Sequence, residues 1–125
     1  MNIGCYAGLE GEPGIENYYI EFPVGATGAV GTIVRQRGLA LPIGVTRSSA
    51  GVYVFTLLDG VNAIIGWGFD ILTASPTTGG AWPRVTARTQ TSITVTVMNA
   101  AGAAATDPNN GDTFVAEITV KNTNA

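Results

Sequence analysis

The sequence contains no histidine among its 125 residues. Histidine is the most frequent general base, the partner of nucleophilic serine and cysteine, and a common zinc ligand. Its absence excludes the familiar hydrolase triads and most zinc sites. The nine Asp and Glu residues remain as acid–base groups, and we expect them at turns and strand ends rather than paired across a glycosidase cleft. The sequence therefore predicts a non-enzymatic protein with no catalytic residues and no cofactor.

Cysteine is nearly absent too, since Cys5 is the single one. It forms no intramolecular disulfide, and without a histidine partner it is expected to be an inert thiol. The first residues show neither the positive region nor the apolar run of a secretory signal, and Asp59 and Asp70 interrupt the apolar stretches before the roughly 18 residues of a membrane span. We expect a protein made in the cytoplasm, without an ordinary export signal and with no membrane partner.

Charged residues are scarce, at 12% against 46% hydrophobic residues. This balance is far from that of disordered chains, so a folded core is expected. A surface made mainly of Thr, Asn, Ser, Gly and Ala favours a homo-oligomer. The net charge of −3 and the total of six Lys and Arg argue against a nucleic-acid partner.

The charges are unevenly distributed along the first half of the chain. Four acids precede the first basic residue, and three bases then follow without an intervening acid. Two interpretations stay open: chance spacing on a solvated surface, or head-to-tail complementarity between subunits. The acids are Glu10, Glu12, Glu16 and Glu21, and the bases are Arg35, Arg37 and Arg47.

Residues 1–17 contain four glycines and one proline and show no apolar period. This composition predicts an extended N-terminal arm, followed by a single domain over residues 18–125. An arm of this kind is expected to become ordered on a partner, which would bury its apolar side chains. The candidate partner-binding residues of the arm are Ile3, Tyr6, Leu9 and Ile15.

From Tyr18 onward, short β-rich runs alternate with clusters of Gly, Pro, Asn and Ser. The pattern predicts an all-β fold, an antiparallel β-sandwich of jelly-roll or immunoglobulin-like type with about eight strands. Period-two alternation is clearest in the last two runs, while Val52–Leu58 is apolar on both faces and is predicted to be a central strand. The predicted strands are Tyr18–Phe22, Ala29–Arg37, Ile43–Arg47, Val52–Leu58, Ala63–Ala74, Arg84–Arg88, Ser92–Met98 and Thr113–Lys121.

Both tryptophans, Trp67 and Trp82, stand beside glycine or proline. The favoured interpretation is that they pack in the core or in a contact between subunits. The alternative is a carbohydrate-binding module in which these two rings and Tyr53 form a platform for a sugar.

The segment Asp107–Asp112 crowds oxygen ligands around a glycine turn. A calcium site built from Asp107, Asn109 and Asp112 is one interpretation, but the glycine falls one place early for an EF-hand loop and the bidentate glutamate is missing. We expect only a turn here and no metal site.

The segments Arg84–Asn99 and Gly111–Asn122, preceded by the strand Gly51–Asp59, form a pattern of strand, loop and closing Gly-Asp strand. This pattern resembles small virion proteins of tailed bacteriophages. Within that group, the resemblance implies a capsid decoration (cement) protein. Such proteins are β-rich modules that sit as trimers or other oligomers on the head lattice and clamp neighbouring capsomers.

The resemblance further implies the major capsid protein as a partner and the capsid surface of the virion as the location. It carries no site residues over to this chain, because decoration proteins act through surface area rather than a signature motif. A phage tail or fibre component is the closest alternative, and the carbohydrate-binding module is the alternative of another class.

Overall fold

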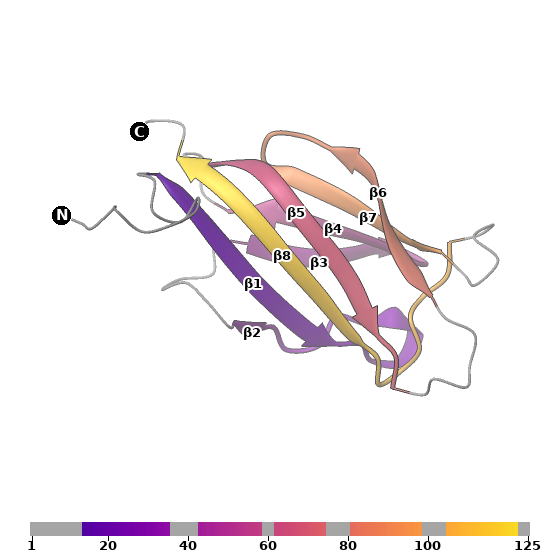
Figure 1. Cartoon of the computed structure of the whole chain (residues 1–125). Coiled ribbons are helices and arrows are strands. Elements are labelled where there is room, and N and C mark those ends of the chain that lie inside the picture. The colour runs from indigo at the N-terminus through magenta and orange to yellow at the C-terminus, as the bar shows by residue number, and fades with distance from the viewer. Residues whose placement is uncertain (1–13, 36–42, 59–61, 75–80, 99–104, 123–125) are drawn as a thin grey trace.

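The computed structural model describes residues 14–35, 43–58, 62–74, 81–98 and 105–122, which form two antiparallel sheets with no α-helix among them. One sheet has the order β2-β1-β8-β5 and the other the order β3-β4-β7-β6, and Figure 1 shows them as two layers. The strands are β1 (Ile15–Pro23), β2 (Val34–Arg35), β3 (Ile43–Ser49), β4 (Val52–Leu57), β5 (Asn62–Leu72), β6 (Trp82–Arg88), β7 (Ser92–Met98) and β8 (Thr113–Asn122).

The first sheet consists of three full strands and the two-residue β2. In this sheet β8 pairs with β1 on one side and with β5 on the other. The alternation predicted for β8 is confirmed, because Phe114, Ala116, Ile118 and Val120 are all buried. These side chains share one face of the sheet, as the period of two requires. The all-β, sandwich-like fold expected from the sequence is therefore present.

The core between the sheets is rich in aromatic rings. The ring centroid of Phe114 lies 5.2 Å from those of Phe22 and Tyr53, and 5.6 Å from that of Phe55. Tilted and offset rings at such distances add to the stabilisation from burial alone. Strand β4 supplies Tyr53 and Phe55 and lies between β3 and β7, which confirms its prediction as a central strand.

Two predicted turns are also confirmed. Strands β6 and β7 form a hairpin in which the Thr89 N–H donates to the Ser92 carbonyl at 2.9 Å. Before β8, Gly111 has a φ of 97°, a conformation that glycine adopts without a steric cost.

No helix in the described residues is long and apolar enough to cross a membrane.

The predicted strand Ala29–Arg37 is largely wrong, because only Val34–Arg35 is a strand among its described residues. A 3₁₀ turn, η3 (Ala26–Gly28), precedes it, and the chain then folds back so that the Gly31 N–H donates to the Pro23 carbonyl at 2.9 Å. A Cβ at Gly31 would lie 2.5 Å from that carbonyl oxygen. The glycines therefore permit a close return of the chain that interrupts the strand.

The boundary of the predicted arm at residue 17 is also wrong for its last residues. Strand β1 starts at Ile15, where the register pairs Ile15 with Lys121 and Asn17 with Thr119. Ile15 is only 8% exposed. Its burial against its own chain excludes it as a free anchor for a partner. Residues 1–13, and with them Ile3, Tyr6 and Leu9, lie outside the described residues.

Candidate functional site

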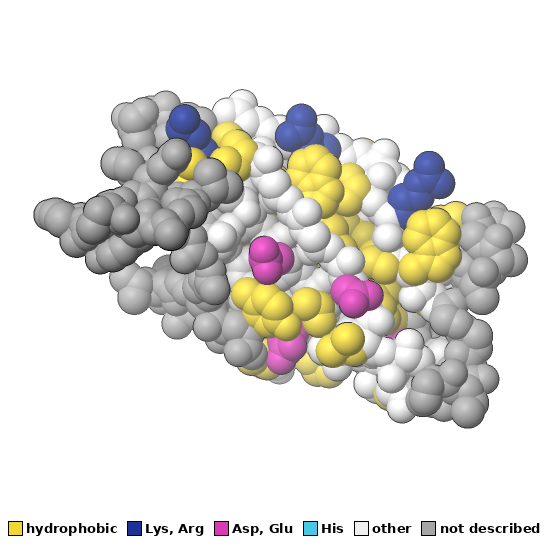
Figure 2. Space-filling view, in the orientation of Figure 1, with side chains coloured by type: hydrophobic (Ala, Val, Ile, Leu, Met, Phe, Trp, Pro, Cys, Tyr) yellow, Lys and Arg dark blue, Asp and Glu magenta, His cyan; other side chains and the backbone are white. Residues whose placement is uncertain are grey.

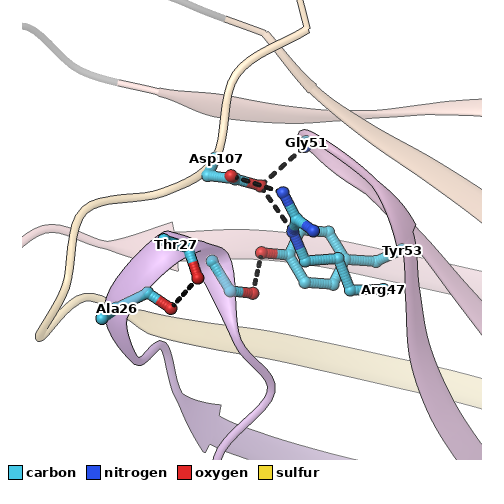
Figure 3. A network of polar contacts seen from close by, with 7 residues as sticks. Ala26, Thr27, Arg47, Gly51, Tyr53 and Asp107 are labelled. Atoms are coloured by element: carbon cyan, nitrogen blue, oxygen red, sulfur yellow. Dashed lines mark hydrogen bonds and ion pairs between the residues drawn. The ribbon is translucent and has the colours of Figure 1, made fainter.

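The most connected polar cluster lies at one end of the sandwich and joins segments that are far apart in sequence (Figure 3). The guanidinium of Arg47 on β3 donates two hydrogen bonds to the carboxylate of Asp107, from Nε to Oδ1 at 2.9 Å and from Nη2 to Oδ2 at 2.7 Å. The Gly51 N–H also donates to Oδ1 of Asp107, at 2.7 Å. These contacts hold the pKa of the Asp107 carboxyl below its ordinary value, chiefly through the hydrogen bonds from Arg47.

The same end of the sandwich contains a buried tyrosine hydroxyl. Tyr53 Oη donates to the Gly28 carbonyl at 2.6 Å, which ties η3 to β4. Burial, followed by the negative charge of Asp107, raises the pKa of Tyr53 to about 12. The hydroxyl therefore stays protonated over the physiological range. The arrangement fastens a turn, a hairpin and the segment before β8 to one another.

This cluster corrects the interpretation of Arg47 as a contact for the acidic arm of another subunit, because its guanidinium is already paired within its own chain. Arg35 pairs through its backbone with Ile20 of β1, and Arg37 lies outside the described residues. The sequence offered no local signal for the Arg47–Asp107 pair, since its members are separated by 60 residues.

The segment Asp107–Asp112 is the turn expected from the sequence, with both carboxylates used as hydrogen-bond acceptors. Asp112 is 2% exposed and accepts from the Ala74 N–H at 3.0 Å and from the Asn109 N–H at 3.0 Å. Asp107 faces Arg47 instead. The carboxylates of Asp107 and Asp112 thus accept hydrogen bonds from different partners. The described residues contain no group of three or more His, Cys, Asp or Glu that would hold a metal ion.

The two tryptophans are exposed at the margins of the sandwich, while Tyr53 is fully buried. A sugar platform that includes Tyr53 is therefore wrong. Trp67 on β5 is 42% exposed and Trp82 on β6 is 43% exposed. The guanidinium carbon of Arg88 lies 5.3 Å from the centre of the Trp67 ring, in a cation–π contact between the two sheets. Trp67 and Trp82 are therefore not core residues. Of the two kinds of packing expected for them, a contact with a partner stays open.

The outer face of the β2-β1-β8-β5 sheet has a shallow hollow of about 330 Å³. Figure 2 shows magenta acidic side chains grouped among yellow ones on this face, with dark blue basic side chains along one rim. Gly68 leaves part of the floor open, since a Cβ there would meet nothing within 4 Å. The lining residues are Tyr19, Trp67, Gly68, Phe69, Asp70, Val115 and Glu117.

The outer face of the β3-β4-β7-β6 sheet has a different character. Residues opposite each other across its strands share this face, and threonine and valine predominate in its central part. The single charged side chain that the register places on it, among the described residues, is Arg84 near the β6 margin. The central part of this face, called the Thr/Val face below, consists of Thr46, Val52, Val54, Thr56, Ser92, Thr94, Thr96 and Met98, and Gly44, Ser49 and Trp82 flank it.

Comparison with protein-family models, with curated proteins and with solved structures gives no match to this chain.

Proposed function

We propose that the chain is a non-enzymatic structural virion protein of the capsid decoration type, which binds a phage head lattice as a homo-oligomer and stabilises it. The observation that carries the proposal is the Thr/Val face. A sheet face rich in threonine and valine and nearly free of charge can be buried against a partner without the large cost of desolvating charged groups. Such a surface is suited to broad contact with a neighbouring protein rather than to the chemistry of a small substrate.

The contacts within the chain support the same conclusion. The carboxylates with the most hydrogen bonds, Asp107 and Asp112, hold loops in place rather than face a cleft. The hollow is shallow and open, whereas sites for small substrates generally enclose most of the ligand. A module that works through surface contact needs rigid loops and broad faces, and this chain has both.

We further propose that the sandwich is of jelly-roll type. Strand β1 pairs with β8 in one sheet, and β4 pairs with β7 in the other. Nested pairs of this kind arise when a long hairpin is rolled up into two layers. The major capsid protein is the proposed partner, and a tail or fibre position is the alternative within the same class.

Self-association is tested by sedimentation equilibrium of the purified chain. We expect an oligomer at micromolar concentration, with a trimer as the favoured form. Thr94→Arg places a charge in the middle of the Thr/Val face and is expected to shift the protein toward monomer. Thr89→Arg introduces the same charge at the exposed β6–β7 turn and serves as the control. A monomeric wild-type protein would contradict self-association.

The location is tested by mass spectrometry of purified phage particles combined with antibody labelling of heads and tails. Label on the heads supports decoration, and label on the tails supports the alternative. The absence of the protein from purified particles would overturn the virion assignment.

A further inference from the structure

Three carboxylates gather on the outer face of the β2-β1-β8-β5 sheet. The register places Tyr19, Glu117 and Gly68 on one rung across β1, β8 and β5, and the next rung contains Glu21, Val115 and Asp70. Each acid is thus a diagonal neighbour of another, at roughly 7–8 Å between Cα atoms. Like charges at this spacing repel, which destabilises the isolated sheet.

Two of these acids, Asp70 and Glu117, line the hollow, and neither makes an ion pair with any residue that the structure describes. The register places Lys121 on this face, on the separate rung of Ile15 and Ala63, and Arg88 lies at the rim over the Trp67 ring. Reduced access to water, followed by the charges of Glu21 and Glu117, raises the pKa of the Tyr19 hydroxyl. The face therefore has a concentrated negative potential around an open, partly apolar hollow, called the acidic hollow below.

The opposite side of the molecule has the complementary surface. Arg84 projects from the β6 margin of the Thr/Val face and makes no ion pair with any residue that the structure describes. Trp82 lies two residues earlier on the same side of β6 and is 43% exposed. The Arg84 guanidinium can pair with the carboxylates of Asp70 and Glu117. The Trp82 ring can pack against the less polar part of the hollow.

We propose that the Thr/Val face of one copy docks on the outer face of the β2-β1-β8-β5 sheet of a second copy, with Arg84 and Trp82 entering the acidic hollow. The inference rests on the proposed self-association and names the two surfaces that make it. The contact is heterologous, because the surfaces that meet are different. Repetition of such a contact gives a closed ring, such as a trimer, when the rotation closes.

The charge distribution favours a second copy over a small cationic ligand. A free cation would neutralise the acids but would leave Trp82 and the Thr/Val face exposed. Docking of a second copy brings the exposed ring, the uncharged face and the counter-charge into the same contact. The same contact explains why Arg84, at the β6 margin, is the single charged residue that the register places on the described part of this face.

The test reverses the charge of each surface and then of both, with self-association measured by sedimentation equilibrium at low and high salt. Glu117→Arg and Arg84→Glu, each alone, are expected to weaken association at least tenfold. The double variant Glu117→Arg/Arg84→Glu is expected to restore it. Lys121→Glu changes the net charge as Arg84→Glu does, but on the rung away from the acidic hollow, and it is expected to associate like the wild type. Circular dichroism and the melting temperature verify that each variant is folded.

The outcomes separate this inference from the proposed function. A monomeric wild-type protein overturns both. If Thr94→Arg dissociates the oligomer while Glu117→Arg and Arg84→Glu do not, self-association stands and this docking geometry is wrong. Loss of association in Lys121→Glu as well would show a general effect of net charge and would overturn the specific contact. Should the hollow variants instead alter binding on a glycan array with association unchanged, the hollow belongs to a sugar and the second-copy contact is rejected.

Discussion

Asp107 accepts a two-pronged pair of hydrogen bonds from the guanidinium of Arg47, which precedes it by 60 residues, at 2.9 and 2.7 Å. A fork of this kind fixes the relative orientation of its two partners as well as their distance. Here it fastens β3 to the segment before β8, and the Gly51 N–H adds a third hydrogen bond from the β3–β4 turn. One end of the sandwich is therefore held by contacts that no local sequence pattern specifies.

The coupling between Arg47 and Asp107 is measurable by a double-mutant cycle. Arg47→Met and Asp107→Asn are each expected to lower the urea midpoint of unfolding, because each leaves a partner without its charged hydrogen bonds. The double variant is expected to be less destabilised than the sum of the two single variants. Additive effects would contradict a stabilising pair. Arg47→Lys keeps the charge but loses the fork, and it is expected to recover only part of the stability.

The pair also predicts a dependence of stability on pH. The pKa of Asp107 is lower in the folded protein than in the unfolded chain, where it is near 3.8. A lowered pKa means that the stabilisation is present above the unfolded value and is lost as the pH falls through the folded value. The difference in unfolding free energy between the wild type and Asp107→Asn should therefore be constant from about pH 5 to 7, where the carboxyl is ionised in the unfolded chain as well. It should shrink in more acidic buffers. A difference that persists at the most acidic pH would contradict the assignment.

Gly51 is expected to be intolerant of a side chain. Its φ is 73°, and a Cβ would lie 2.6 Å from the Thr106 backbone nitrogen. Gly51→Ala should cost more than about 2 kcal/mol of unfolding free energy, from the left-handed conformation and the clash with backbone. The matched control is Gly68→Ala, where a Cβ meets nothing within 4 Å. The control should stay within about 0.5 kcal/mol of the wild type, as measured by urea denaturation of both variants.

Removal of the Tyr53 hydroxyl is expected to leave the Gly28 carbonyl without its donor. Tyr53→Phe should destabilise the protein by about 1–2 kcal/mol, since both groups are buried. Absorbance titration near 295 nm offers a second readout: the wild type should contain a phenol that titrates at about pH 12, and the variant should lack it. Because the folded pKa is raised, the stabilisation is complete below the unfolded value of 10.0 and declines as the pH rises toward 12. Equal alkaline stability of the two proteins would contradict this expectation.

Two truncations test the corrected start of the first strand. Deletion of residues 1–17 removes Ile15 and its pairing with Lys121, whereas deletion of residues 1–13 leaves β1 complete. The longer deletion should be less stable than the shorter one by about 1.5–3 kcal/mol, the value of burying one large aliphatic side chain. Equal melting temperatures for the two truncated proteins would mean that Ile15 and its pairing contribute nothing to stability.

The sequence by itself determined the all-β character and much of the core. Alternation in Ser92–Met98 and in Thr113–Lys121 identified the buried side chains of β7 and β8, because a strand with one buried face repeats every two residues. The two-faced run at Val52–Leu58 likewise marked a central strand. These properties are local, so a single stretch of chain contains all the information they need.

The early end of strand pairing after Pro23 was not predictable in the same way. Valine and isoleucine between residues 29 and 37 favour a strand locally, and the close return of the chain at Gly31 depends on contact with Pro23. Strand propensity is weak beside such tertiary contacts. The exposed Trp67 and the buried Tyr53 show the same limit, since both belong to apolar runs and differ only in where their strands lie.

Only the tertiary structure decided which charges meet. Arg47 is paired with Asp107 of its own chain, not with an acidic arm. Glu21, Asp70 and Glu117 come from three strands and share one surface because β8 lies between β1 and β5. The order and register of strands distant in sequence are set by the packing of the whole core. A linear pattern of charges therefore contains no information on which carboxylates become neighbours.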